Sequence, residues 1–447
     1  MKSFLELFRG PGGRSYAFPF ALVCTLFFLW GFCNGLIDIL NKHFQSALNI
    51  SKAESAWVQC ANFSGYLVMA IPAGILARRY GYKGGILIGL AIIAAGALWF
   101  LPATRIGTFP AFLGGLFILA QGLAILETIA NPYATVLGPP RFGAARINLA
   151  QVCNAVGTFL GPLIGSQFVL SATGTASSSN ATLYIPYLGI AGLVVVLTVC
   201  FVFAELPDIA AEEEAPAGAP SAAGPARVKP LWRRWHFTLA VVAQFLYVAA
   251  QIGVWSSYVN YLTSGETPGF GAGFAAWFPA NMIYAEGAQF HFTEQGAGIL
   301  LSLGGFGLFI LGRLAGSALL RVLSAHVALA LFGVVNTVLM VLIVARLGWV
   351  SVGALFLSSF FMSIMYPTIF ALGIRGLGEA TKLASSLIVM AIAGGAVMPI
   401  VMGWLADVSH SMSIGFLMPL GCFAFVTVYA AAWPALERHD SGHEVAD

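Results

Sequence analysis

The stretch LAILETIANPYATVLG, residues 123–138, places one carboxylate, Glu127, in the middle of a long apolar run. The run extends over 109–136, which is long enough to cross the roughly 30 Å hydrocarbon core of a bilayer as a helix. A carboxylate near the bilayer centre costs a few kcal/mol to insert, so it normally faces a cavity or a partner. Pro132 also leaves the carbonyl of Thr128 without its usual helical donor. The stretch therefore predicts a membrane helix that carries a functional polar site.

The rest of the chain has the composition of a membrane protein. Of its 447 residues, 59% are hydrophobic and only 9% are charged, whereas soluble proteins carry about 25% charge. Apolar runs long enough to span a bilayer occur twelve times, so the predicted fold class is all-α with twelve membrane helices. The runs cover residues 17–40, 54–77, 84–102, 109–136, 145–170, 182–204, 236–262, 295–318, 326–345, 349–374, 383–406 and 413–434.

A polar segment at 206–235, rich in Ala, Pro, Gly and charge, divides the twelve spans into two sets of six. It cannot bury a core, so we expect a linker between an N-terminal bundle over 1–205 and a C-terminal bundle with a short tail over 236–447. The fourth span of each half carries a related motif, NPYATVLG at 131–138 and YPTIFALG at 366–373. Such internal duplication is typical of secondary transporters, which bind their substrate near the membrane midplane between the halves.

Lys and Arg residues set the expected orientation in the membrane. Of the 21 such residues, 17 are assigned to one side, with Arg313 and Arg321 counted among its loops. By the positive-inside rule, both termini are cytoplasmic, and we expect the protein in the inner (plasma) membrane. The net charge of +3 is explained by these loops and requires no nucleic-acid partner. The first apolar run is too long for a signal-peptide core, so we expect it to be retained.

Nothing in the sequence points to an enzyme or a metal centre. The seven histidines fall at the ends of spans, in loops or in the tail, and neither HExxH nor GxSxG occurs. The six cysteines lie inside predicted spans without CxxC spacing, so we expect buried thiols rather than disulfides or metal ligands. We therefore predict no catalytic residues, no metal and no cofactor.

Two groups of amides and aromatic residues have the character of a sugar-binding surface. The fifth span carries Gln151, Asn154 and Thr158 at spacings that place them on one helical face. The seventh span carries a longer stripe of the same kind, made of Gln244, Tyr247, Gln251, Trp255 and Tyr258. Sugar hydroxyls need donors and acceptors, and the apolar face of the ring packs on an indole or phenol. An interhelical polar seam is the alternative interpretation of each stripe.

The first span contains a second carboxylate, within FFLWGFCNGLIDIL at 27–40. Asp38 lies four residues after Asn34, toward the outer end of the expected helix. Its position alone leaves two interpretations open, a solvated helix end beside Lys42 or a titratable group of a transport site.

Several stretches together resemble the fucose–proton symporter family of the major facilitator superfamily. They are FFLWGFCNGLIDIL, LETIANPYATVLGP, RINLAQVCNAVGT, AQIGVWSSYVNY, YPTIFALGI and SSLIVMAIAGGAVMPIVMG, and the resemblance covers nearly the whole chain. It implies two pseudo-symmetric six-helix bundles that take up a sugar with a proton by alternating access. It also implies that Asp38 and Glu127 are the functional carboxylates. The cavity residues that it implies are Gln151, Asn154 and Tyr366, the last before a broken tenth helix.

We therefore expect proton-driven uptake of L-fucose or a closely related hexose, with Glu127 as the first candidate for the coupling site and Asp38 as the second. The candidate substrate-binding residues are Asn34, Gln151, Asn154, Gln251, Trp255 and Tyr366. Symport of another hexose, such as glucose, galactose or N-acetylglucosamine, and a membrane sugar sensor that does not transport are the alternatives. The expected partners are the sugar, the proton and membrane lipid, and we expect a monomer.

Two features depart from the family pattern. Permeases of this type commonly show more Asn before the first-span aspartate, whereas here Gly35 and Ile37 interrupt that run. We expect a more apolar wall there, which favours a deoxy-hexose over a fully hydroxylated one. The outer segment 263–292 is longer than the family needs. We expect a variable surface loop, with a lid or an interfacial loop as the alternative.

Overall fold

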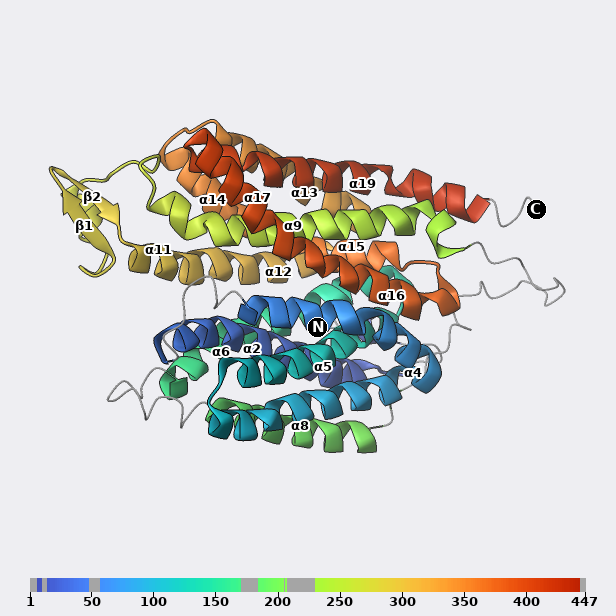
Figure 1. Ribbon diagram of the computed structural model, residues 1–447. Coiled ribbons are helices and arrows are strands. Elements are labelled where there is room, and N and C mark those ends of the chain that lie inside the picture. Colours follow the sequence, from blue (N-terminus) through green and yellow to red (C-terminus); the bar gives the residue numbers. More distant parts are fainter. Residues whose placement is uncertain are drawn as a thin grey trace. The chain divides into compact units, whose positions relative to one another are not determined.

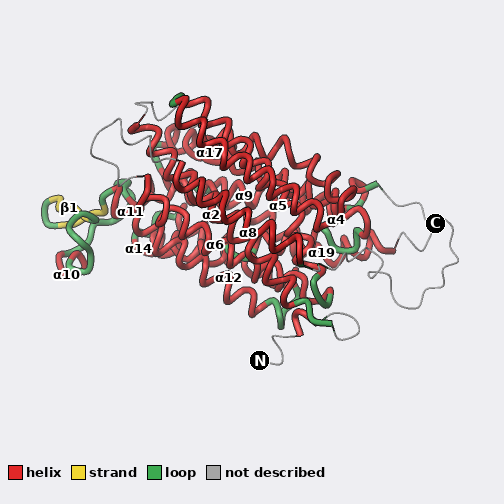
Figure 2. Tube along the Cα trace, turned by 90° about the horizontal axis from the view of Figure 1, so that it is seen from below, coloured by secondary structure: helices red, strands yellow, loops and turns green. Residues whose placement is uncertain are grey.

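The computed structural model of the chain describes the backbone of residues 6–9, 14–47, 57–169, 184–204, 206 and 230–442. Within these ranges, the side chains of 38–47, 59, 162–169, 186, 294–295, 379 and 441–442 lie outside the described part. Helices make up most of the described chain, and one small two-stranded sheet accompanies them (Figure 2). The predicted all-α class is confirmed.

The described helices form two compact units. The first comprises Met1–Leu231 together with Ile374–Met390, and the second comprises Trp232–Gly373 together with Ala391–Asp447. The division after Leu231 falls inside the predicted linker, most of which lies outside the described residues. The linker and the two bundle boundaries therefore stay predictions.

The first unit contains five long helices from the N-terminal half and a short one from the C-terminal half (Figure 1). They are α2 (Ala17–Ala47), α4 (Trp57–Ile106), α5 (Phe109–Val136), α6 (Gly143–Val169), α8 (Tyr184–Phe203) and α16 (Thr381–Met390). Single 3-10 turns lie at Glu6–Phe8, Pro140–Phe142 and Gly378–Ala380. Helix α4 holds two predicted spans, which join at Gly81 with φ 70° and ψ −177°. Only glycine adopts that conformation readily, so Gly81 allows the chain to turn between the spans.

The second unit holds the remaining elements. They are α9 (Trp235–Leu262), α10 (Ala272–Ala275), β1 (Ile283–Glu286), β2 (Gln289–Phe292), α11 (Glu294–Leu300), a π-helical turn (Leu301–Phe306), α12 (Gly307–Leu319), α13 (Ala325–Val344), α14 (Trp349–Met362), α15 (Met365–Gly373), a 3-10 turn (Ala391–Ala393), α17 (Gly394–Ser409), α18 (Met412–Gly415) and α19 (Leu417–Gly442); a 3-10 turn at Leu231–Arg233 precedes them. The eighth, tenth and eleventh predicted spans are each interrupted. Discontinuous helices of this kind are typical of transporters near their substrate sites.

Each of the twelve predicted spans coincides with helix in the described residues. Nine segments there are long and apolar enough to cross a membrane. One of them, Cys60–Ile106, contains two predicted spans, and the apolar α8 and the helix α6 account for two more. The helices therefore accommodate twelve membrane passes.

Helices α2 and α6 cross in close contact at glycine residues. A Cβ atom added at Gly31 would lie 2.0 Å from the carbonyl oxygen of Asn154. One added at Gly161 would lie 3.1 Å from the Cα atom of Gly35. Small residues spaced four apart let membrane helices approach closely. Gly35 thus packs against α6, and its interpretation as part of an apolar wall facing the sugar is wrong.

The segment 263–292 contains α10, β1 and β2 and forms an ordered lobe beyond the end of α9 (Figure 1). Strands β1 and β2 pair antiparallel, with Ile283 opposite Phe292. The buried rings of Phe270 and Phe292 lie 4.9 Å apart, and Trp349 at the start of α14 lies edge-on to Phe270 at 5.9 Å. Aromatic packing of this kind fastens the lobe to α14.

Glu266 ties the base of this lobe to the start of α18. Its Oε2 atom accepts a hydrogen bond from the backbone nitrogen of Ser413 at 2.9 Å and another from the Ser413 hydroxyl. Burial by itself would raise the pKa of Glu266, but hydrogen bonds from Ser411 and Ser413 and the charge of Arg346 lower it overall. The fold therefore stabilises the ionised form of this carboxyl group.

We expect the stability of the protein to fall as the pH drops through the lowered folded-state pKa of Glu266. A carboxyl group with a lowered folded-state pKa stabilises the fold above its unfolded pKa and loses that contribution on protonation. Because Glu266 is partly exposed, the expected loss is at most about 2 °C in the thermal unfolding midpoint. The midpoint is measured from about pH 6 to about pH 3, which extends below the ordinary glutamate pKa, in the native protein and in Glu266→Gln. Identical pH dependence in the two proteins would contradict the assignment.

All six cysteines are free thiols in this structure. Cys33 and Cys422 are buried, whereas Cys60 and Cys200 are exposed on the surfaces of α4 and α8. The expectation of burial is wrong for these two. In a membrane, apolar side chains on the outer face of a helix contact lipid, which is as apolar as a protein core.

Candidate functional site

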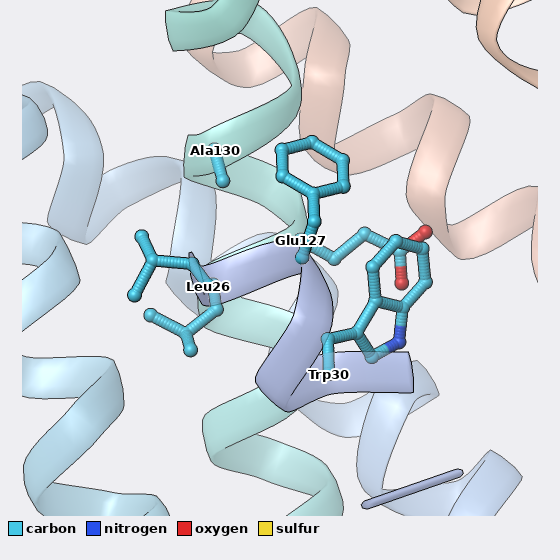
Figure 3. Close-up of a pocket in the computed structure, with 6 residues that line it drawn as sticks. Leu26, Trp30, Glu127 and Ala130 are labelled. Atoms are coloured by element: carbon cyan, nitrogen blue, oxygen red, sulfur yellow. The ribbon is translucent and has the colours of Figure 1, made fainter. Parts of the chain in front are cut away.

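Glu127 lies on α5 and is 1% exposed, so its carboxylate is buried inside the first unit. It shares a small pocket between α5 and α2, and Figure 3 shows its side chain extending toward the indole of Trp30. The lining consists of Leu26, Phe27, Trp30, Leu126, Glu127 and Ala130. Every lining residue except Glu127 is apolar, and burying a charge in such surroundings costs free energy.

Polar groups from two neighbouring helices come close to this carboxylate. The phenol of Tyr66 on α4 is within electrostatic range of Glu127 and lies beside the side chains of Trp30 and Asn34 from α2. Asn34 was a candidate from the sequence, whereas Tyr66 and Trp30 carried no signal that distinguishes them from other aromatic residues in apolar runs. The carboxylate of Glu127 therefore has a phenol and an indole near it, and the amide of Asn34 lies beside that phenol.

A pair of amides lies one helical turn further along α5. Gln151 on α6, 1% exposed, donates from Nε2 to Oδ1 of Asn131 at 3.4 Å, which is long for a hydrogen bond. Asn131 is fully buried and follows Glu127 by four residues, so both lie on the same face of α5. Sequence reasoning missed Asn131, although this spacing was available as a signal.

Asn154 contacts α2, whereas Thr158 forms a hydrogen bond within α6. The Nδ2 atom of Asn154 donates to the carbonyl oxygen of Phe27 at 3.3 Å. The hydroxyl of Thr158 donates to the carbonyl oxygen of Asn154 in its own helix at 3.1 Å. The bond of Asn154 to α2 is the kind of contact expected of an interhelical seam, and the role of Asn154 in sugar binding stays a prediction. Gln151, by contrast, forms its hydrogen bond with Asn131 of α5.

Asp38 lies in α2, four residues after Asn34. Its side chain is outside the described residues. The role of this second carboxylate stays a prediction.

In the second unit, three residues of the α9 stripe follow one another at single helical turns. Tyr247 is fully buried and donates its hydroxyl to the carbonyl oxygen of Met362 at 2.9 Å. Gln251 is 8% exposed, and its side chain is within hydrogen-bonding range of Tyr247. Trp255 packs edge-on against Phe309 of α12, with ring centroids 5.1 Å apart. The stripe therefore contacts both α12 and the end of α14.

Tyr366 is 6% exposed near the start of α15, directly before Pro367. Arg313 of α12 is 5% exposed and lies within electrostatic range of the phenols of Tyr366 and Tyr247. The sequence-based assignment of Arg313 to a cytoplasmic loop is wrong, because α12 continues to Leu319 and buries it. Its position inside the predicted span 295–318 could have indicated that Arg313 lies in a membrane helix rather than in a loop.

These polar groups suit a neutral, hydroxyl-rich ligand. The described residues of the first unit provide a titratable carboxylate beside amides and a phenol, and those of the second provide amides, phenols and an indole. Such groups donate and accept hydrogen bonds, and the carboxylate can hold or release a proton. Among the described residues, no cluster of three or more His, Cys, Asp or Glu side chains could hold a metal ion.

The sequence matches the Major Facilitator Superfamily over residues 22–391. It is 36% identical over 434 residues to the L-fucose-proton symporter of Escherichia coli, which covers 93% of each chain. It is also 34% identical over 418 residues to the glucose/galactose transporter of Brucella abortus, which covers 93% of this chain and 94% of that protein.

Solved structures agree with these matches. A crystal structure of the Escherichia coli fucose:proton symporter has a TM-score of 0.79 at 35% identity and covers 94% of this chain and 99% of its own. A crystal structure of the same transporter in the outward conformation has a TM-score of 0.77 with the same coverage. These relatives are transporters, which confirms the prediction that the protein is not an enzyme. The chain belongs to the Major Facilitator Superfamily, in the branch that contains the L-fucose-proton symporters and the glucose/galactose transporters.

Proposed function

We propose that the protein carries L-fucose, or a closely related hexose, into the cell together with a proton. The observation that carries this proposal is Glu127, a carboxylate buried in a membrane helix beside Trp30 and within electrostatic range of Tyr66. A permanent charge at this depth is costly, and a carboxylate avoids that cost by binding a proton. The 36% identity to the L-fucose-proton symporter of Escherichia coli supports the same activity.

Protonation of Glu127 would determine when the binding site can reorient from one side of the membrane to the other. A protonated, neutral site reorients across the low-dielectric barrier more easily than a charged one. The membrane potential supplies about 2.3 kcal/mol per charge per 100 mV to drive the cycle inward. We assign Asp38 as the second carboxylate, which acts through the sugar hydroxyls or as a further proton site.

Alternating access requires one side of the transporter to close while the other opens. Helix α16 belongs to the C-terminal half of the sequence but packs within the first unit. A Cβ atom on Gly74 of α4 would lie 2.7 Å from the Ser386 hydroxyl, and Lys382 lies 4.9 Å from the centre of the Tyr82 ring. By the positive-inside rule, we expect the bend at Gly81 in the middle of α4 on the cytoplasmic side. We infer that release of α16 from α4 opens the cytoplasmic side.

Amides and aromatic rings are the candidate sugar-binding groups of each unit. We assign hydrogen bonding of the ring hydroxyls to Asn34, Gln151 and Gln251, and packing of the apolar ring face to Trp255 and Tyr366. Asn154 takes part by holding α6 against α2 through Phe27, which keeps Gln151 in register.

The choice of sugar depends on the apolar wall beside Glu127. L-fucose is a 6-deoxy sugar, whose methyl group is best buried against apolar side chains such as Leu26, Phe27 and Ala130 of this pocket. An apolar wall rejects an added hydroxyl by about 10²-fold at most. L-galactose, which carries that hydroxyl, is therefore a weaker competitor. The 34% identity to a glucose/galactose transporter makes a hydroxylated hexose the competing assignment.

We further propose that the protein is a monomer in the inner membrane with both termini in the cytoplasm. With Arg313 removed from the loop count, 16 Lys and Arg residues remain assigned to one side against 4 on the other. The bias that orients the chain is therefore nearly unchanged.

Uptake of radiolabelled L-fucose into proteoliposomes tests the proposal. Accumulation above equilibrium is expected only with an inward proton gradient, and a protonophore should abolish it. Binding without uptake would instead indicate a sugar sensor. If D-glucose or N-acetylglucosamine competes better than unlabelled L-fucose, the fucose assignment fails and symport of another hexose remains.

Replacing Gln151 or Asn154 with alanine should weaken the apparent affinity for the sugar by about 1–3 kcal/mol, the cost of leaving a buried hydroxyl without its partner. Gln151→Ala removes the amide directly, and Asn154→Ala removes the hydrogen bond that holds α6 to α2. The measurement is the KM of proton-driven uptake. Thr198→Ala on α8, which removes a hydroxyl that donates to the carbonyl oxygen of Val194 in its own helix, is the matched control. If both variants keep the native KM, the fifth-span stripe is a packing seam and the sugar site lies elsewhere.

A further inference from the structure

Arg313 is a buried cation that the proposed transport cycle does not use. It lies on α12 inside an apolar span, and its side chain is 5% exposed. A charged side chain at membrane depth costs several kcal/mol unless it pairs with polar groups. In transporters, such residues therefore either take part in transport or position the residues that do.

The backbone that Arg313 contacts is the interruption between α14 and α15. Pro367 has no N–H group, so it cannot donate to the carbonyl four residues earlier, which belongs to Ser363. The Nε atom of Arg313 donates to that carbonyl oxygen at 3.2 Å. The guanidinium thus supplies the hydrogen bond that the proline removes.

The neighbouring carbonyl is satisfied from α9. Tyr247 donates its hydroxyl to the carbonyl oxygen of Met362 at 2.9 Å, and its ring lies within electrostatic range of Arg313. The same phenol is within hydrogen-bonding range of Gln251. One of the assigned sugar-binding amides is therefore connected to the interruption through a single side chain.

The guanidinium is also connected, through Phe309, to the assigned sugar-binding indole of Trp255. It lies over the ring of Phe309 at 4.5 Å from the centroid, and Phe309 packs edge-on against Trp255 at 5.1 Å. Tyr366, the residue directly before Pro367, is within electrostatic range of the same cation. Arg313 is thus connected to each of the three second-unit residues assigned to the sugar.

Close helix packing makes these contacts possible. A Cβ atom on Gly312 would lie 2.3 Å from the carbonyl oxygen of Phe360, and one on Gly316 would lie 2.1 Å from the Ile364 side chain. The two glycines flank Arg313 and bring α12 against the end of α14. A planar guanidinium, which donates in a fixed fork and stacks on an aromatic face, suits this geometry better than the flexible ammonium of lysine.

We propose that Arg313 is the positioning residue for the sugar-binding residues assigned to the second unit. It holds the proline interruption in one conformation and thereby sets the positions of Tyr366, Gln251 and Trp255. The proposal rests on the proposed sugar transport, because those three residues are its assigned ligands. Arg313 acts through them and stays apart from proton coupling, which belongs to the carboxylates of the first unit.

Two substitutions distinguish a positioning role of the Arg313 guanidinium from a role of its positive charge alone. Arg313→Gln removes the charge and the guanidinium, and Arg313→Lys keeps the charge without the Nε donor and the planar stack. Both are expected to weaken L-fucose binding to the purified protein, measured by calorimetry, by about 10–100-fold. The pH at which uptake is half-maximal should stay at its native value in both variants. Arg321→Gln, which removes an arginine just beyond the end of α12, is the matched control and should bind as the native protein does.

A double-mutant cycle tests whether Arg313 acts through its hydrogen bond to the Ser363 carbonyl. Pro367→Ala restores a backbone N–H group that can donate to Ser363, so Arg313 becomes less necessary. The fold-loss in L-fucose affinity caused by Arg313→Gln should be several times smaller in the Pro367→Ala background than in the native one. Equal losses in both backgrounds would overturn the proposal. So would full rescue of binding by Arg313→Lys, since charge alone would then suffice.

Hydrogen exchange gives a readout that needs no sugar. Backbone amides over residues 360–368 should exchange at least several-fold faster in Arg313→Gln than in the native protein, while those of α13 should not change. If the native protein binds no L-fucose but this exchange still accelerates, the proposed substrate fails and the positioning role stands. If the native protein binds L-fucose and both variants leave binding and exchange unchanged, the positioning role fails.

Discussion

Replacing Glu127 with glutamine is expected to abolish proton-driven accumulation of sugar while leaving sugar exchange across the membrane intact. Glutamine has the shape and neutral charge of the protonated acid, so the variant can bind sugar and reorient without a proton. A potential of 100 mV supplies about 2.3 kcal/mol per proton, which corresponds to roughly 50-fold accumulation in a coupled transporter. In Glu127→Gln the inside and outside concentrations should instead become equal.

The measurement pairs uphill uptake with counterflow in the same proteoliposomes. Counterflow needs binding and reorientation but no net proton movement, so it reports whether the variant is folded and active. Glu266→Gln makes the same chemical change outside the membrane spans and is the matched control, with native accumulation expected. Undiminished uphill transport by Glu127→Gln would exclude Glu127 as the coupling site. If Asp38→Asn then lost accumulation and kept counterflow, the coupling proton would belong to Asp38.

Replacing Gly31 with alanine is expected to destabilise the first unit severely. The added methyl group would lie 2.0 Å from the carbonyl oxygen of Asn154, and this is a backbone atom that moves only if α6 moves. Overpacking that forces such a backbone shift costs about 3 kcal/mol or more. The shift would also displace Gln151 one turn away on α6 and Trp30 beside the glycine on α2. Sugar binding should therefore weaken along with stability.

The thermal unfolding midpoint of the purified protein measures this effect, with Gly189→Ala and Gly192→Ala on α8 as controls. A Cβ atom at either control position meets no atom within 4 Å. There the usual preference of helices for alanine over glycine, about 1 kcal/mol, should leave the midpoint unchanged or slightly higher. If Gly31→Ala unfolds at the same temperature as the controls, the contact between α2 and α6 is looser than these distances indicate.

The predictions from sequence that concern depth in the membrane agree with the structure. The run 109–136 coincides with α5, and the interruption expected near Tyr366 separates α14 from α15. Glu127 is buried, as its place in the middle of an apolar run indicated. These features depend on local composition, since a bilayer admits only long apolar helices and proline removes a specific hydrogen bond. Neither requires knowledge of which helices are neighbours.

The sequence alone did not predict which residues each side chain contacts. Arg313 and Ser363 are 50 residues apart along the chain, and their hydrogen bond exists only because α12 packs against the end of α14. Gly35 was assigned to the sugar-facing wall, although it faces Gly161 of α6.

Hydropathy reports how deep a residue lies in the membrane, whereas its direction around the helix and its neighbours follow from packing between distant segments. The sequence therefore determined the membrane spans, the family and the first-unit carboxylate. Only the tertiary structure decided what surrounds that carboxylate, and that a buried arginine stabilises the interruption beside Tyr366.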